Sequence, residues 1–79
     1  MTLQELDINQ IALVEAISTE AKDERFKIRL EAMGMTPGKP IRVLRSAILG
    51  GPLQVRVGST TEIAIRRSEA SLVKVTTTA

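Results

Sequence analysis

The sequence predicts a small, mostly β barrel of about five short strands, with one inserted α-helix at about residues 21–33. Short segments that alternate apolar and polar residues recur along the chain, which is typical of half-buried strands. Glycine and proline separate most of these segments and mark turns. One stretch instead has the apolar spacing of a helix. A chain of 79 residues suits one small domain, which we place at residues 1–79.

The helix is indicated by Phe26, Leu30 and Met33, which recur at helical spacing and form one apolar stripe. Gly34 follows this stripe and can take the left-handed conformation that ends a helix. Met35 can then fold back on the last turn. The Thr-Pro-Gly sequence at 36–38 suits a tight turn, since proline presets φ and glycine accepts positive φ.

The first strand is expected at Ile11–Ile17, an apolar run rich in β-branched residues. In a regular strand, alternate side chains share a face. We therefore expect the small set Ala12, Val14 and Ala16 to point into the barrel, and Leu13 and Ile17 to lie on the opposite face.

The other strands are expected at residues 40–46, 53–57, 62–66 and 72–75. The segments 53–57 and 62–66 are separated by a short turn and should form a hairpin. Single helical turns are predicted near residues 2–5, where Thr2 and Glu5 fit a capping box, and at 67–71.

The composition disfavours an enzyme or a metalloprotein. The chain has no histidine and no cysteine, so the commonest general base, metal ligand and thiolate are missing. We expect no catalytic residue, no metal and no cofactor. No apolar run approaches the roughly 18–20 residues that span a bilayer, and the N-terminus lacks the pattern of a signal peptide. These features indicate a cytoplasmic protein without membrane insertion.

Residues 30–38 read Leu-x-x-Met-Gly-Met-x-Pro-Gly and are followed by Ile-x-Val at 41–43. Together with the segments at 6–10, 50–57 and 63–70, in this order, they resemble the FeoA family from Leu3 to Val75. The resemblance implies an SH3-like barrel with a helix after the first strand. It also implies an accessory role in bacterial ferrous iron transport, through contact with the cytoplasmic G-protein domain of the membrane transporter FeoB.

The partner-binding residues we predict are Ile48, Leu49, Arg42 and Arg45. Two bulky apolar residues beside Gly-Gly-Pro are unusual in a solvated turn and can form an apolar finger for a partner. The alternative is that one of them plugs the end of the barrel. The arginines supply a basic surface for an acidic partner, with Arg42, Gln54, Arg56 and Arg66 sharing an outer face; an ordinary solvated face is the alternative.

Other interpretations are weaker. The carboxylates Glu20, Asp23, Glu24 and Glu31 lie near the helix, but no imidazole accompanies them, and a solvated face explains them better. The same module resembles the C-terminal domain of iron-dependent repressors, so a detached regulatory domain or a nucleic-acid-binding barrel is the alternative function. We expect no nucleic acid, because no aromatic cluster can stack bases. Edges at the second and fifth strands can pair copies into a homo-oligomer.

Overall fold

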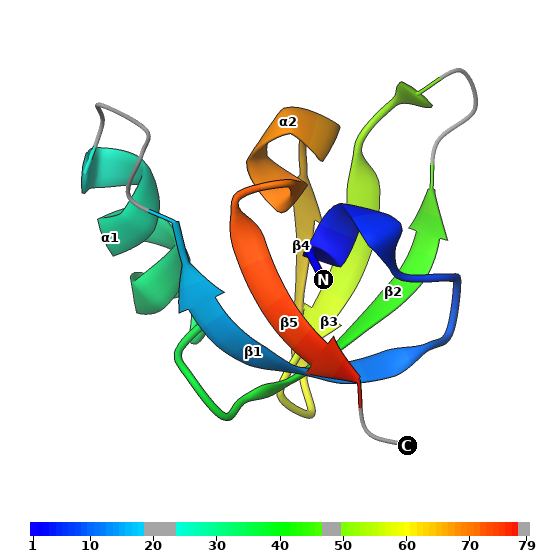
Figure 1. The fold of residues 1–79 in the computed structure, drawn as a ribbon, viewed down its shortest axis with the longest axis horizontal. Helices are drawn as coiled ribbons and strands as arrows, with labels where there is room; N and C mark the ends of the chain where they lie inside the picture. The colour runs from blue at the N-terminus through cyan, green and yellow to red at the C-terminus, as the bar shows by residue number, and fades with distance from the viewer. Residues whose placement is uncertain (19–23, 47–49, 78–79) are drawn as a thin grey trace.

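The fold is a single antiparallel sheet with short helical segments before and between its strands. A computed structural model describes residues 1–18, 24–46 and 50–77. The five strands are hydrogen-bonded in the order β4-β3-β2-β1-β5 (Figure 1). They are β1 (Ile11–Ile17), β2 (Pro40–Ser46), β3 (Leu53–Val57), β4 (Thr61–Ile65) and β5 (Val73–Thr77). The predicted strand count is confirmed, and the last two strands begin within a residue of the expected positions.

The described residues form three helical segments, of which the first precedes β1, the second follows β1 and the third follows β4. They are η1 (Leu3–Glu5), α1 (Glu24–Ala32) and α2 (Arg67–Ala70). Of these described segments, only α1 has more than one turn; it follows β1 in the chain, as the sequence predicted. Figure 1 shows α1 at one side of the sheet and η1 close to β5.

The edges of the sheet differ from the expectation. β2 pairs with both β1 and β3 and is therefore the central strand, so the expected edge at the second strand was wrong. The edge strands are β4 and β5. The start of the chain covers part of β5, where Thr2 forms a bridge with Lys74 and the Val75 N–H donates to the Met1 carbonyl at 2.9 Å.

The inner face of the curved sheet forms an aliphatic core. Alternate residues of the strands point into it, including Ile41, Val43, Val55 and Ile65, each no more than 1% exposed. Phe26 on α1 packs against its margin. No polar or charged side chain is buried among the described residues, so the core is stabilised by apolar burial alone.

A β-bulge in β1 changes the predicted alternation. The pairing of β1 with β5 shifts register between Val14 and Ala16. Ala12 and Val14 are buried as expected, but Ala16 is exposed and Ile17 is buried, so these two assignments were wrong. A bulge inserts one extra residue, which reverses the side-chain alternation beyond it.

The end of α1 is built as predicted, except for one side chain. Gly34 has φ of +94°, and the Met35 N–H donates to the Leu30 carbonyl at 3.0 Å. This turn brings Met35 fully into the core. Met33, expected on the buried stripe, is 36% exposed. The helix ends at Ala32, so the core position near its end is filled by Met35 instead.

Candidate partner-binding face

The outer face of the sheet carries most of the arginines that the sequence singled out. On β3, Gln54 and Arg56 alternate with buried Leu53, Val55 and Val57 and therefore point outward. Across the strands, Arg42 is opposite Arg56, which is opposite Glu62, and Arg45 is opposite Gln54. We call this surface the basic face; its residues are Arg42, Arg45, Gln54, Arg56 and Glu62.

A second β-bulge places Arg45 on the basic face. Residues three apart in a regular strand point to opposite faces, so Arg42 and Arg45 would be separated. The register of β2 against β3 shifts between Val43 and Arg45, and the extra residue returns Arg45 to the outer side. There its Nε donates a hydrogen bond to Gln54 Oε1 at 2.9 Å.

The charges on the basic face are unbalanced. Arg56 Nη2 lies 3.0 Å from Glu62 Oε2, and both side chains are 38% exposed. Arg42 stands directly opposite Arg56, and like charges in such a pair are unfavourable. Within the described part of the chain, the Arg42 guanidinium has neither a carboxylate nor a hydrogen-bond partner. The face therefore has three guanidinium groups and one carboxylate.

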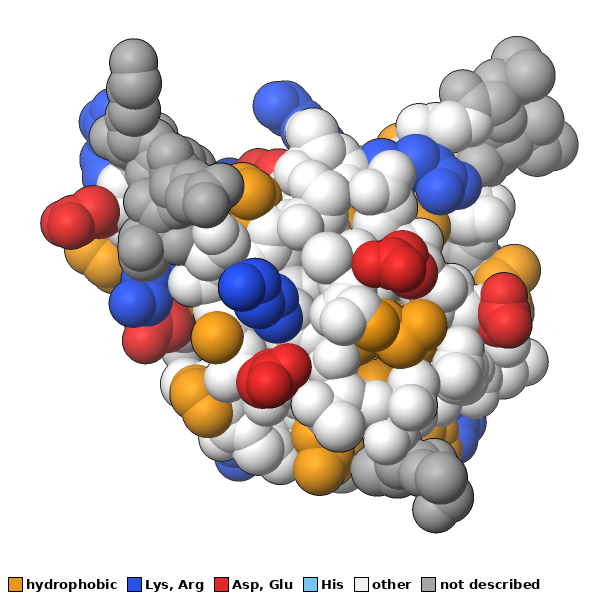
Figure 2. Space-filling model, in the orientation of Figure 1, with side chains coloured by type: hydrophobic (Ala, Val, Ile, Leu, Met, Phe, Trp, Pro, Cys, Tyr) orange, Lys and Arg blue, Asp and Glu red, His pale blue; other side chains and the backbone are white. Residues whose placement is uncertain are grey.

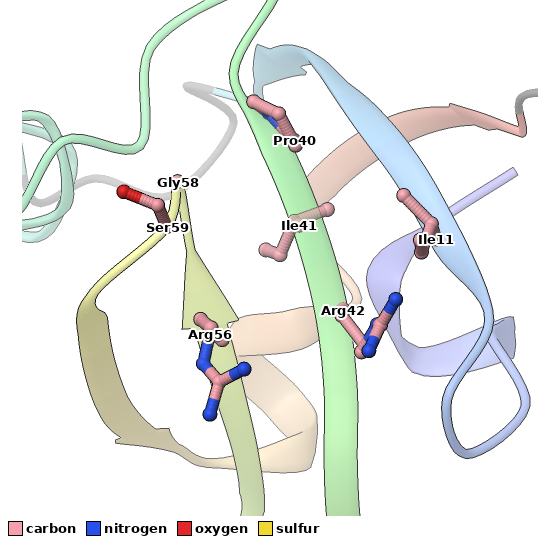
Figure 3. A pocket seen from close by; sticks show the side chains of 7 residues that line it. All are labelled: Ile11, Pro40, Ile41, Arg42, Arg56, Gly58 and Ser59. Atoms are coloured by element: carbon pink, nitrogen blue, oxygen red, sulfur yellow. The ribbon is translucent and has the colours of Figure 1, made fainter.

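A pocket of about 190 Å³ lies at the edge of this face, over β1, β2 and β3 (Figure 3). Its lining comprises Ile11, Pro40, Ile41, Arg42, Arg56, Gly58 and Ser59. Figure 3 shows the Arg42 side chain turned toward Ile11, whereas the Arg56 side chain extends away from Ile11. Ile11 is opposite Arg42 in the pairing of β1 with β2 and is 41% exposed. The pocket thus combines an apolar wall with one unpaired cation.

The pocket adds two residues that the sequence reasoning missed, Ile11 and Pro40. The alternation in β1 could have identified Ile11. Ile11 and Glu15 are an even number of positions apart in the strand, so both side chains point outward. Pro40 is at the start of β2 and is exposed. These two side chains are neighbours because β1 pairs with β2, and this pairing cannot be read from the sequence.

The remaining predicted residues are distributed differently. Ile48 and Leu49, like Glu20 and Asp23, lie outside the described residues. Arg66 follows the end of β4 and lines a separate groove of about 370 Å³ with Met33 and Ile63, so it does not join the basic face. Arg29 and Glu69 form an ion pair of 2.7 Å beside that groove.

The side of the molecule that carries β5 and η1 has a different character. Figure 2 shows basic, acidic and apolar side chains interspersed on this side. Among the residues that the structure describes, no group of three or more carboxylate, histidine or cysteine side chains is placed to hold a metal ion. No described helix is long and apolar enough to cross a membrane.

Comparisons with known proteins identify the family. The FeoA domain model matches residues 1–77. No curated protein matches the chain. The solution structure of a FeoA protein from Chlorobium tepidum is 30% identical, with a TM-score of 0.89, and the match covers 100% of this chain and 71% of that one.

A second structure is FeoA from Stenotrophomonas maltophilia in complex with zinc, described as a procaryotic SH3 domain protein and a candidate activating factor of ferrous iron transport. It is 36% identical, with a TM-score of 0.82, over 95% of this chain and 88% of that one. A manganese-dependent transcriptional repressor shares the fold alone, at 18% identity and a TM-score of 0.84, over 99% of this chain and 41% of the repressor. With its five-stranded SH3-like sheet and the family match over residues 1–77, the chain belongs to the FeoA family, which is linked to ferrous iron transport.

Proposed function

We propose that this protein is a non-catalytic accessory protein of bacterial ferrous iron transport that contacts the G-protein domain of FeoB in the cytoplasm. The family links the chain to ferrous iron transport. The observation that carries the proposed contact is the basic face, where Arg42, Arg45 and Arg56 face solvent and Glu62 is the one carboxylate among its described residues. Such a surface favours an acidic partner, because complementary charge steers association and selects the orientation.

The contact would have a charged and an apolar part. In the sequence, Ile48 and Leu49 follow Ala47, the first residue after β2, and β2 is the strand that carries Arg42 and Arg45. Apolar side chains at an interface supply most of the affinity when they are desolvated, and charges around them supply rate and specificity. We therefore assign partner binding to these four residues together, with the protein at the inner face of the membrane only through FeoB.

The chemistry of the sequence supports a role without catalysis. The chain has no histidine and no cysteine, which provide the base or the nucleophile in many active sites. The large groove beside β4 is walled by an Arg29–Glu69 ion pair and apolar side chains, and these groups do not pair a nucleophile with a base.

The test is an NMR titration of the ¹⁵N-labelled chain with the soluble G-protein domain of FeoB. We expect the largest shift changes at residues 42–57, and their loss in the Leu49→Asp variant. Thr77→Asp, an exposed change at the end of β5, is the matched control and should bind normally. Shift changes confined to β5 and α2, or normal binding by Leu49→Asp, would contradict the proposal.

Duplex DNA is the second titrant, because the fold is shared with a transcriptional repressor. Phosphate contacts release counterions, so DNA binding should fall steeply with salt. Strong, salt-sensitive shifts at Arg42, Arg45 and Arg56 with DNA, and none with the G-protein domain, would replace the proposed function by nucleic-acid binding.

A further inference from the structure

We propose that the pocket over β1, β2 and β3 recognises an extended acidic segment of a protein partner. In this arrangement a carboxylate of the segment binds the Arg42 guanidinium, and an aliphatic side chain two residues away packs against Ile11 and Pro40. The inference deepens the proposed function and rests on it only for the identity of the partner, which would carry the segment on the FeoB G-protein domain.

The charge pattern at Arg42 indicates a carboxylate ligand. Arg42 and Arg56 are direct cross-strand neighbours, an arrangement that costs stability unless an anion offsets it. Glu62 offsets the charge of Arg56, with its Oε2 3.0 Å from Arg56 Nη2. No described carboxylate offsets the charge of Arg42. A guanidinium presents a planar fork of N–H donors that matches both oxygens of a carboxylate.

The wall beside Arg42 indicates an aliphatic group next to that carboxylate. Ile11 is 41% exposed, and the Arg42 side chain turns toward it (Figure 3). The buried Ile41 and the exposed Pro40 continue the apolar lining. A cavity of about 150 Å³ can hold a benzene ring, so a pocket of about 190 Å³ has room for one branched aliphatic side chain.

The spacing of the two features fits an extended peptide. Ile11 and Arg42 are on paired strands, which run about 4.7–4.9 Å apart. In an extended segment, side chains two residues apart lie on the same side at about 6.6–6.8 Å, so one can meet the cation while the other meets the apolar wall. A phosphate group alone offers no partner for Ile11, and this favours a peptide over a nucleic acid.

The test uses short peptides and the full labelled chain, without FeoB. The probes are the acetylated and amidated peptide Gly-Glu-Ser-Leu-Gly and its reversed sequence, so that both directions of the segment are sampled. Peptides with glutamine in place of glutamate are the matched probes. Binding of such short segments is expected in the millimolar range, so the titration extends to about 10 mM.

We expect at least one glutamate peptide to shift the resonances of Ile11, Ile41 and Arg42, and the glutamine peptides to bind about tenfold more weakly, because they lose a charge-assisted hydrogen bond. Arg42→Gln should weaken the glutamate peptide to a similar extent. Lys74→Gln is the matched control: it removes one positive charge at an exposed position on β5, outside the pocket, so it should change the Kd less than about twofold.

Equal binding of glutamate and glutamine peptides, equal effects of Arg42→Gln and Lys74→Gln, or no shifts at Ile11 at the highest concentration would each overturn the inference. The outcome is independent of the proposed function. Peptide binding at Arg42 without binding of the G-protein domain would keep the pocket and reject FeoB, whereas the reverse result would keep FeoB and reject the pocket.

Discussion

The two faces of strands β2, β3 and β4 have opposite chemistry although their residues alternate along the same chain. The inner positions Ile41, Val55 and Ile65 are almost fully buried. The outer positions opposite one another include Arg42, Arg56 and Glu62. Neighbouring residues of one strand therefore serve different purposes, with inner residues stabilising the fold and outer residues available for partner binding. Substitutions one position apart should accordingly affect either stability or binding.

The largest effect is expected on the inner face. Ile65→Ala removes a side chain that is 1% exposed and leaves a cavity, so it should lower the free energy of unfolding by about 2–5 kcal/mol. Urea unfolding followed by circular dichroism measures this loss. Ala64→Ser, next to it on the exposed side, is the control and should change the free energy by less than about 0.5 kcal/mol. Equal effects of the two would remove the distinction between the faces.

A smaller loss is expected where α1 joins the inner face. Gly34 has φ of +94°, and nothing lies within 4 Å of a methyl group added there. Gly34→Ala should therefore cost about 1–2 kcal/mol through backbone strain alone, since the left-handed conformation is unfavourable for alanine. Urea unfolding checks the value, and a neutral result would mean that this turn is not needed to bring Met35 into the core.

The outer ion pair should contribute little to stability. Arg56 and Glu62 are each 38% exposed, and ion pairs at such sites are screened by water. Arg56→Gln loses this pair but also removes the like charge opposite Arg42, so the free energy of unfolding should change by less than about 0.5 kcal/mol. If urea unfolding showed that Arg56→Gln lowers the free energy of unfolding by more than about 1.5 kcal/mol, the outer face would contribute to stability, contrary to this prediction.

The smallest effect concerns Glu5, at the N-terminal turn outside both faces. A hydrogen bond from the Thr2 backbone N–H, at 2.9 Å, and a second from its hydroxyl lower the pKa of Glu5 below its ordinary 4.5. Because the pKa is lower in the folded state, the contribution of Glu5 is complete above about pH 4.5 and is lost as the pH falls through the folded value.

The variant Glu5→Gln should therefore be slightly less stable than the natural chain at about pH 7, and the difference should be smaller at about pH 3. Urea unfolding at the two pH values measures the difference. A difference that grows toward acid would contradict the sign of the pKa shift.

Much of the fold could be predicted from local patterns. The alternation in β3, and the glycine that ends α1, each have a direct physical cause in the sequence, and both are confirmed. The two β-bulges could not be predicted, because an extra residue in a strand leaves no compositional mark in this chain. The bulge in β1 accounts for the wrong assignment of Ala16 and Ile17.

The candidate site could be predicted only in part, for the same reason. Arg42 and Arg45 were named from the sequence, but their common face depends on the bulge in β2. The apolar wall at Ile11 depends on the pairing of β1 with β2, a contact between residues distant in sequence. The pairing of strands, rather than any single motif, assembles the pocket.

The central claim is that the basic face binds the partner without stabilising the fold. The direct measurement compares Arg42→Glu with Lys74→Glu, the same charge reversal at an exposed site on β5. Both variants are analysed by urea unfolding and by calorimetric titration with the FeoB G-protein domain. We predict that Arg42→Glu keeps or slightly gains stability, because it replaces a repulsive cross-strand pair. The same variant should bind the G-protein domain at least about tenfold more weakly. Lys74→Glu should bind within about threefold of the natural chain. Equal binding by the two variants, or a parallel loss of binding and stability in Arg42→Glu, would contradict the account.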